Sequence, residues 1–249
     1  MEGRHIMDKP QEINGFQVFV VEDEHEGGKV AFELVQAAYA QGAQVFGLAT
    51  GSTPETLYEE LKASNLDFSD RISVNLDEYV GLSGDHPQSY RYFMEEKLFN
   101  EKPFKQNFVP NGLADEETEI QRYNQVLQDY PIDLQILGIG TNAHIAFNEP
   151  GTSFEAKTHK VKLTEATIEA NKRFFDSEED VPRYAYSMGI ASILEADQII
   201  LLAYGPKKAQ AIRDMIHADK TEQIPATALQ DHANVTVVVD QAAAEKLAV

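Results

Sequence analysis

Polar residues that could carry out chemistry gather in the stretch LGIGTNAHIAFNEPGTSF, which follows the apolar run IDLQIL at 132–137. They are Asn142, His144, Asn148 and Glu149. A polar turn after a strand is ordinary loop chemistry, but the carboxyl end of a parallel strand is also where α/β proteins place catalytic groups. The chain has no cysteine, so a hydroxyl, a carboxylate or an imidazole must carry any chemistry.

A second polar strand end lies in VNLDEYVGL, where Asp77 and Glu78 follow the apolar run at 71–76. A strand core does not tolerate an unpaired charge, so one of the two carboxylates must face a cleft. A carboxylate there can act as a general base, and partial burial would raise its pKa toward the working pH. Two solvated turn acids before Gly81 remain the alternative.

A third strand end, LATGSTPETLYEEL, runs through a glycine turn into the start of a helix. Ser52 or Thr53 is expected to cap the helix, with Pro54 in its first turn. Gly51 would allow close approach to the backbone N–H groups of the helix start, which is a ready site for a phosphate or a carboxylate. Plain helix capping would use the same residues. The stretch matches neither the GxGxxG motif nor a Walker loop, which argues against nucleotide binding.

The elements that position these residues alternate along the chain. Continuous apolar runs predict strands at 16–21, 43–50, 71–76, 132–139, 198–204 and 234–240. Apolar residues at three and four spacing predict helices at 27–41, 54–64, 88–99, 115–129, 206–217 and 241–247. Buried strands separated by helices indicate an α/β protein with a doubly wound, mostly parallel sheet in a three-layer α/β/α sandwich, which is Rossmann-like. Ligands bind at the carboxyl ends of the strands in such sheets, so the three polar strand ends should meet.

Composition limits the possible partners. The 249 residues, 43% of them hydrophobic, can form a sizeable core, and no linker or repeat divides them. The first residues, MEGRHIM at 1–7, resemble a vector-derived remnant, so we expect one domain over 8–249. A formal charge of −20 argues against a nucleic-acid partner or an anionic membrane surface. We expect a soluble, cytoplasmic protein.

The histidines show neither HxH nor HExxH spacing, and the acidic residues form no convincing cage for a cation. We therefore expect no metal and no organic cofactor.

Several motifs together resemble the glucosamine-6-phosphate deaminases of the glucosamine-6-phosphate isomerase family. They are LATGSTP, LDEYVGL, GIGTNAHIAFNEPGTSF, NKRFFD at 171–176 and GPKKA at 205–209. The resemblance runs from about residue 18 to the C-terminus, and LDEY with the HIAFNEP loop separates the deaminases from the related phosphogluconolactonases. It implies conversion of glucosamine 6-phosphate and water to fructose 6-phosphate and ammonia, in amino-sugar catabolism.

The resemblance also implies roles for individual residues. His144 would move the protons of ring opening. Glu149 would orient its imidazole, and Asn142 would complete the group. Asp77 would take the proton from C2 and return one to C1, while its neighbour Glu78 would be structural.

The substrate phosphate would contact Arg173 and Lys208, with backbone donors from the turn of Gly51, Ser52 and Thr53. The charged segment at about 155–187, which carries no strong strand or core pattern, is predicted to form a mobile lid.

One departure from the family pattern concerns Asn142 and Ala143, where many members have Asp-Gly. Asn142 can orient His144 but cannot ionise, which leaves its catalytic role open. Ala143 predicts a backbone that avoids positive φ at this position.

A second departure concerns regulation. Larger family members are hexamers activated by N-acetylglucosamine 6-phosphate, and two of their basic positions correspond to His159 and Val161 here. A one-residue shift would instead bring in Lys160 and Lys162. The chain also stops at Val249, without the C-terminal extension of the regulated members. We expect an unregulated, monomeric enzyme with hyperbolic kinetics.

Two other functions are compatible with such a fold. One is a phosphogluconolactonase-like hydrolase. The other is a catalytically silent sugar-phosphate sensor, which would normally need a DNA-binding helix pair for which this chain has no spare residues. Ammonia release from glucosamine 6-phosphate separates these functions from deamination.

Overall fold

A computed structural model describes residues 9–248, so the predicted remnant at 1–7 lies outside the described residues. The main sheet contains eight strands. In spatial order they are β1 (Gln11–Ile13), β2 (Phe16–Val21), β11 (Val235–Asp240), β10 (Gln198–Ala203), β7 (Leu134–Leu137), β3 (Val45–Leu48), β4 (Ile72–Asn75) and β6 (Gln106–Phe108). Within the described part of this sheet, only β1 and β2 pair in the antiparallel sense. The mostly parallel sheet is confirmed.

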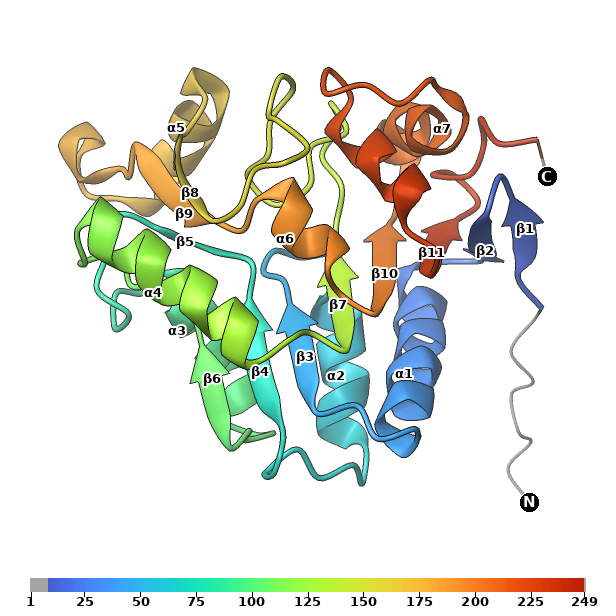
Figure 1. Ribbon diagram of the computed structural model, residues 1–249, viewed down its shortest axis with the longest axis horizontal. Coiled ribbons are helices and arrows are strands. Elements are labelled where there is room, and N and C mark those ends of the chain that lie inside the picture. Colours follow the sequence, from blue (N-terminus) through green and yellow to red (C-terminus); the bar gives the residue numbers. More distant parts are fainter. Residues whose placement is uncertain (1–8, 249) are drawn as a thin grey trace.

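Helices cover both faces of this sheet (Figure 1). One face packs against α1 (Glu24–Ala40), α2 (Glu55–Ala63), α3 (Tyr90–Met94) and the π-helical turn Glu95–Phe99. The other packs against α4 (Glu116–Asp129), α6 (Ile190–Leu194), α7 (Ala209–His217) and the 3-10 segment Pro225–Asp231. Within β10, Ile199 and Leu201 join one core while Ile200 and Leu202 join the other, as the two-residue period of a strand requires. The three-layer sandwich is therefore confirmed.

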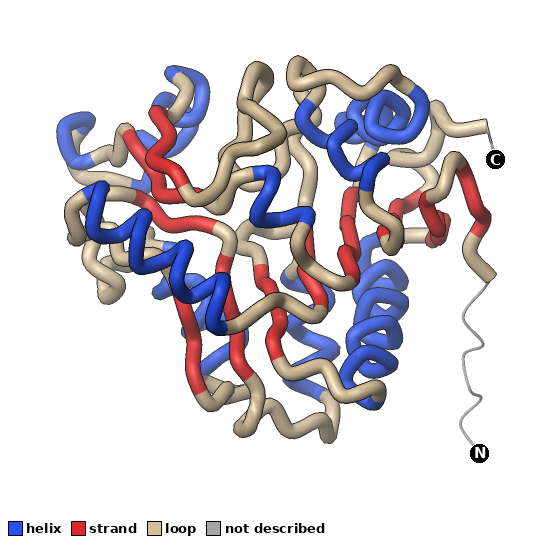
Figure 2. The backbone as a smooth tube through the Cα atoms, in the orientation of Figure 1, coloured by secondary structure: helices blue, strands red, loops and turns tan. Residues whose placement is uncertain are grey.

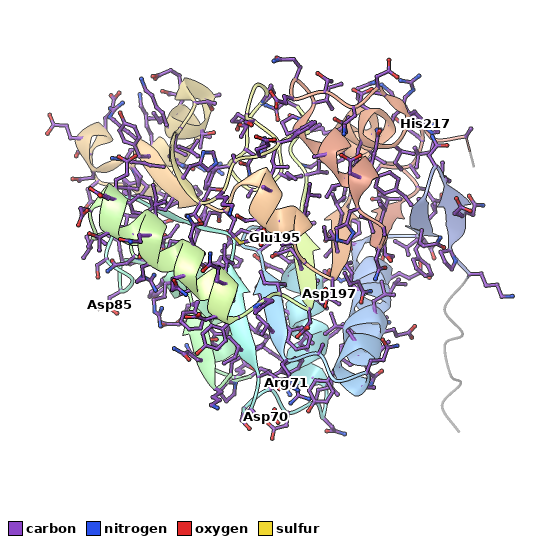
Figure 3. The ribbon with its side chains drawn as sticks, viewed as in Figure 1. Asp70, Arg71, Asp85, Glu195, Asp197 and His217 are labelled. Carbon is purple, nitrogen blue, oxygen red and sulfur yellow. The ribbon has the colours of Figure 1, made fainter. Side chains whose placement is uncertain are left out.

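The parallel strands all point the same way. Figure 3 places Asp70 and Arg71, joined by a 2.6 Å ion pair, at the lower edge of the molecule, where β4 begins. The carboxyl ends of the strands lie at the opposite edge, beneath a group of loops and a second, smaller sheet (Figure 2). The three polar strand ends of the sequence accordingly meet at this edge.

The small sheet consists of β5 (Asp77–Tyr79), β9 (Tyr184–Ser187) and β8 (His159–Lys162), paired antiparallel in that order. Between β8 and β9 lie α5 (Glu165–Asn171) and two 3-10 turns, Lys172–Phe174 and Glu178–Asp180. The prediction that 155–187 carries no strand or core pattern is wrong. Strands of four residues give a weak periodic signal. The segment also has its own small apolar cluster, in which Leu163, Ile168, Val181 and Ala185 pack with Tyr79 and Leu82.

A second correction concerns the predicted helix at 241–247, which forms turns instead. The segment is too short to be a stable helix on its own, so packing decides its conformation. Ala243 and Ala244 are buried in the core, and the Asp240 carboxylate accepts the N–H groups of both Ala243 and Gly205. These contacts favour a turn at the end of β11.

Candidate active site

A cavity of about 740 Å³ opens at the carboxyl ends of β3, β4 and β7. The residues proposed from the sequence that line it are Gly51, Ser52, Thr53, Asp77, His144 and Lys208. Four segments far apart in the sequence supply them. The topology of the sheet brings these residues together, because its parallel strands end side by side.

Asp77 follows β4 directly and begins β5, and its side chain is only 7% exposed. Burial raises the pKa of this carboxyl from 3.8 to about 8, and the nearby charge of Glu78 adds to the effect. A carboxyl whose pKa lies near neutrality can both release and recapture a proton at the cavity wall.

Glu78 has a different environment, because successive side chains of a strand point to opposite sides. Its carboxylate accepts the N–H groups of Tyr79, Tyr90 and Arg91 at 2.8, 2.9 and 3.0 Å. Burial raises the Glu78 pKa, and these three hydrogen bonds oppose the rise. Glu78 therefore anchors the start of α3 (Tyr90–Met94), in agreement with the structural role expected for it.

His144, Asn142 and Glu149 form one hydrogen-bonded group. The Asn142 amide donates through Nδ2 to Glu149 Oε2 at 2.8 Å, and its Oδ1 lies 2.7 Å from His144 Nδ1. Asn142 Oδ1 also accepts the backbone N–H of His144 at 3.1 Å. Glu149 Oε1 lies 3.5 Å from His144 Nδ1. Asn142 and Glu149 are not among the residues that line the cavity, and both contact the His144 imidazole, which does.

The amide orientation determines the state of the imidazole. A carboxylate only accepts, so the Asn142 amide must turn its Nδ2 to Glu149 and its Oδ1 to His144. His144 Nδ1 therefore carries the proton in the neutral ring, and Nε2 keeps a lone pair. Burial lowers the His144 pKa, the Glu149 charge raises it, and the Lys208 charge lowers it. A neutral imidazole that can accept a proton at Nε2 results.

The turn that carries His144 is closed by two backbone hydrogen bonds, from Gly140 N–H to His144 O and from Ala143 N–H to Gly140 O, both 2.9 Å. Ala143 has φ of +66°, so the prediction of a negative φ at this position is wrong. The left-handed conformation costs about 1–2 kcal/mol for a residue other than glycine, and the closed turn and the burial of Ala143 hold it in place. A Cβ on Gly140 would lie 2.1 Å from the His144 ring, so glycine is required there for the ring to lie as it does.

The N-terminus of α2 lies at the cavity, as expected for a phosphate-binding site. Gly51 has φ of +90°, a conformation that favours glycine. The expected cap by Ser52 or Thr53 is wrong: Pro54 occupies the N-cap position, and no side chain caps the helix. The turn is closed by the backbone instead, with Glu55 N–H donating to Ser52 O at 3.2 Å. Both hydroxyl-bearing residues are thereby left at the cavity wall, beside a helix N-terminus.

The two predicted basic residues occupy different environments. Lys208 lines the cavity, and its Nζ donates to Ile139 O at 2.5 Å; burial lowers its pKa. Arg173 is exposed, does not line the cavity, and places its guanidinium 4.6 Å from the centre of the Phe174 ring. From the same segment it is Asn171 that reaches the cavity wall, together with Phe174.

An aromatic wall was not predicted. The Tyr79 and Tyr90 ring centres lie 4.6 Å apart, and Tyr90 stacks with Phe147 at 6.2 Å. Asn171 Nδ2 donates to the Tyr79 hydroxyl at 3.1 Å, which ties α5 to β5. Tyr79 and Asn171 lie within motifs noticed in the sequence, whereas Tyr90 had no local signal beyond its helical spacing.

Among residues 9–248, no group of three or more histidine or acidic side chains is placed to hold a metal ion. No helix in that part of the chain is both long and apolar enough to cross a membrane.

Fold and site together place the chain among α/β proteins whose ligand cavity lies at the carboxyl edge of a parallel sheet. More narrowly, the chain belongs to the family of glucosamine-6-phosphate isomerases and 6-phosphogluconolactonases, whose model matches residues 25–238.

The chain is 59% identical to a glucosamine-6-phosphate deaminase of Streptococcus pneumoniae strain 70585, over 90% of this chain and 96% of that protein. It is 58% identical to a glucosamine-6-phosphate deaminase of Streptococcus pyogenes serotype M1, over 93% and 99% respectively.

A solved structure of a monomeric glucosamine-6-phosphate deaminase has a TM-score of 0.87 and 42% identity, covering 92% of this chain and 99% of that one. The 6-phosphogluconolactonase of Leishmania guyanensis has a TM-score of 0.77 at 21% identity, covering 94% and 99%, and shares the fold.

Proposed function

We propose that this protein is a glucosamine-6-phosphate deaminase, which converts glucosamine 6-phosphate and water to fructose 6-phosphate and ammonia in amino-sugar catabolism. One observation carries the proposal: a buried carboxyl with a raised pKa, a neutral imidazole and a lysine beside a helix N-terminus line a single cavity. Relatives at 58–59% identity with this activity support it.

The first chemical step is ring opening, for which His144 is the acid–base group. Its Nε2 accepts the proton of the anomeric hydroxyl and delivers a proton to the ring oxygen as the C1–O bond breaks. Asn142 and Glu149 hold the proton on Nδ1 and stabilise the imidazolium that forms transiently. Asn142 contributes by orientation alone, because an amide does not ionise.

The second step moves a proton from C2 to C1, and Asp77 carries it. The ionised Asp77 carboxylate removes the C2 proton, and a proton of the substrate ammonium group passes to the C1 oxygen to give an enolamine. Asp77 then returns its proton to C1. The product is an imine at C2, to which water adds before ammonia leaves. Burial suits Asp77 to this exchange, since it brings the carboxyl pKa close to neutrality.

The phosphate is bound by the turn of Gly51, Ser52 and Thr53, together with Lys208. Arg173 joins this group only when the part of the predicted lid (155–187) that lies between β8 and β9, residues 163–183, moves over the cavity, because its side chain now lies outside. We place residues 8–249 in one catalytic domain that includes this lid.

The protein acts as a cytoplasmic monomer with hyperbolic kinetics, and no aminosugar phosphate regulates it. Two residues considered for an effector site already have partners within the chain. His159 Nε2 lies 2.9 Å from Asn148 Oδ1, and Lys160 Nζ lies 4.6 Å from the centre of the Tyr184 ring and 3.9 Å from the Glu116 carboxylate. Light scattering, with substrate titrations in the presence and absence of N-acetylglucosamine 6-phosphate, tests this. A hexamer mass or an effector-straightened sigmoidal curve would overturn it.

The activity itself is tested by measuring ammonia release from glucosamine 6-phosphate. Wild type should release ammonia, and Asp77→Asn should retain less than a tenth of the wild-type turnover. Asp85 is a carboxylate at the periphery of the molecule (Figure 3), so Asp85→Asn should behave as wild type. Hydrolysis of 6-phosphogluconolactone without ammonia release would identify a lactonase instead. Substrate binding without any turnover would identify a sensor.

A further inference from the structure

Three polar residues form one row across the small sheet. Asp77 of β5 lies directly opposite Ser187 of β9, which lies directly opposite His159 of β8. Residues paired in this way carry their side chains on the same face of a sheet. The row therefore begins at the carboxylate that lines the cavity and ends two strands away from it.

The other two members of this row hold the loop that carries the acid–base group. Ser187 Oγ accepts the N–H of Phe147 at 3.2 Å and donates to Met188 O at 3.0 Å. His159 Nε2 lies 2.9 Å from Asn148 Oδ1. The row thus contacts two successive residues of the loop, immediately before Glu149.

The hydrogen bonds of Asn148 assign the direction of its contact with His159. Asn148 is fully buried, and its Nδ2 donates to Ile145 O and to Met188 O, both at 2.9 Å. Two carbonyls can only accept, so Asn148 Oδ1 must face His159, and His159 Nε2 must carry the proton. Each polar atom of the buried amide then has a partner, and removal of His159 would leave Asn148 Oδ1 with none.

Asn148 is connected to the acid–base group through two residues, Ile145 and Glu149. The carbonyl that Asn148 holds belongs to the residue after His144, and Asn148 itself precedes Glu149 in the chain. Its position therefore affects both ends of the group formed by His144, Asn142 and Glu149. Neither His159 nor Asn148 is among the residues that line the cavity.

We propose that His159 is a positioning residue that fixes the His144–Glu149 group relative to Asp77, through Asn148 and the shared row of the small sheet. The proposal rests on the proposed deaminase function, in which these groups act on successive steps. It predicts a loss of turnover without a loss of substrate binding, because the phosphate contacts lie on other elements.

The test compares three variants of the full chain. His159→Leu removes the donor, His159→Gln keeps a donor of similar reach, and Lys162→Gln changes an exposed residue on the same strand as a control. We expect His159→Leu to lower kcat roughly tenfold with KM within about twofold, from the loss of one buried hydrogen bond. His159→Gln should recover most of that loss, and Lys162→Gln should match wild type.

A second measurement does not depend on activity. The imidazole titration of His144 is followed by NMR without substrate, with the resonance assigned through His144→Gln. His159→Leu should shift that titration, and His159→Gln should restore it. Absence of ammonia release by wild type would refute the deaminase function, whereas the titration would still report on the positioning.

Unchanged kcat and an unchanged His144 titration in His159→Leu would overturn the proposal. So would a fall in melting temperature with kcat preserved, which is the result of a purely structural role. If His159→Leu does not fold, Ser187→Ala removes the row's other contact with the loop, and wild-type kcat in that variant would overturn the proposal equally.

Discussion

The side-chain amide of Asn142 donates a hydrogen bond to the Glu149 carboxylate over 2.8 Å, and this contact determines which way the amide points. The oxygen of the amide is thereby turned to His144, whose free Nε2 is the base proposed for ring opening. A neutral residue between an imidazole and a carboxylate also keeps a second negative charge away from the imidazole.

Asn142→Asp should raise the pKa of His144, because it adds a carboxylate 2.7 Å from Nδ1 in place of a neutral amide. Turnover should stay within roughly tenfold of wild type, since Asp can still accept from Nδ1. NMR titration of His144, with kinetics on the same samples, measures both effects. An unchanged or lowered His144 pKa would contradict the assigned geometry.

Gly140→Ala should lower turnover by roughly 10²- to 10⁴-fold, the usual worth of a positioned acid–base group, because the new Cβ would occupy the space of the His144 ring. Gly138→Ala is the matched control: a Cβ there meets nothing within 4 Å. Steady-state kinetics compare the two. Similar activity in both variants would show that the ring does not need its present position.

The pH dependence of kcat/KM should reflect Asp77, whose pKa burial raises to about 8. The carboxylate form is the base, so activity should rise with pH through the range below about 8. The His144 pKa is lowered from its ordinary value, so His144 is already neutral at the pH at which Asp77 ionises. Kinetics between pH 5 and 9 test this. A profile that is flat down to pH 5 would mean that Asp77 is ionised in the free enzyme.

Asp77→Asn should stabilise the protein at high pH. A carboxyl whose pKa is raised on folding binds its proton more tightly in the folded state, so wild-type stability falls as pH rises from about 4 to 8. The variant lacks this loss, so its unfolding free energy relative to wild type should rise between pH 4 and pH 9 by on the order of 5 kcal/mol, since each pKa unit corresponds to about 1.4 kcal/mol. Urea unfolding at the two pH values measures it, and an equal difference at both would contradict the raised pKa.

Lys208→Met should lower kcat/KM for glucosamine 6-phosphate about 10- to 100-fold, mainly through KM, because it removes a charge-assisted contact worth about 1.5–3 kcal/mol. Lys207→Met is the control, since Lys207 is the exposed neighbour and does not line the cavity. Equal KM values in the two variants would show that the phosphate does not bind at Lys208.

Local patterns in the sequence were sufficient for six of the eight strands of the main sheet and for the place of the site, whereas the three-residue edge strands β1 and β6 were not predicted. The apolar runs that became β10 and β11 are buried strands whose composition alone indicates that both of their faces are covered. Polar residues that follow such runs must gather at one edge, since parallel strands end together, and Asp77 and His144 do.

Tertiary structure decided what depends on residues distant in the chain. Ala143 adopts positive φ because a closed turn and the core around it offset the local cost of that conformation. The strands at His159–Lys162 and Tyr184–Ser187 have four residues each, and they exist through pairing with each other and with Asp77–Tyr79. Arg173 lies outside the cavity because the fold of its own segment turns it there. A side chain's type and neighbours in sequence limit the chemistry it can do, but its direction and its pKa are set by long-range packing, which no short stretch of sequence contains.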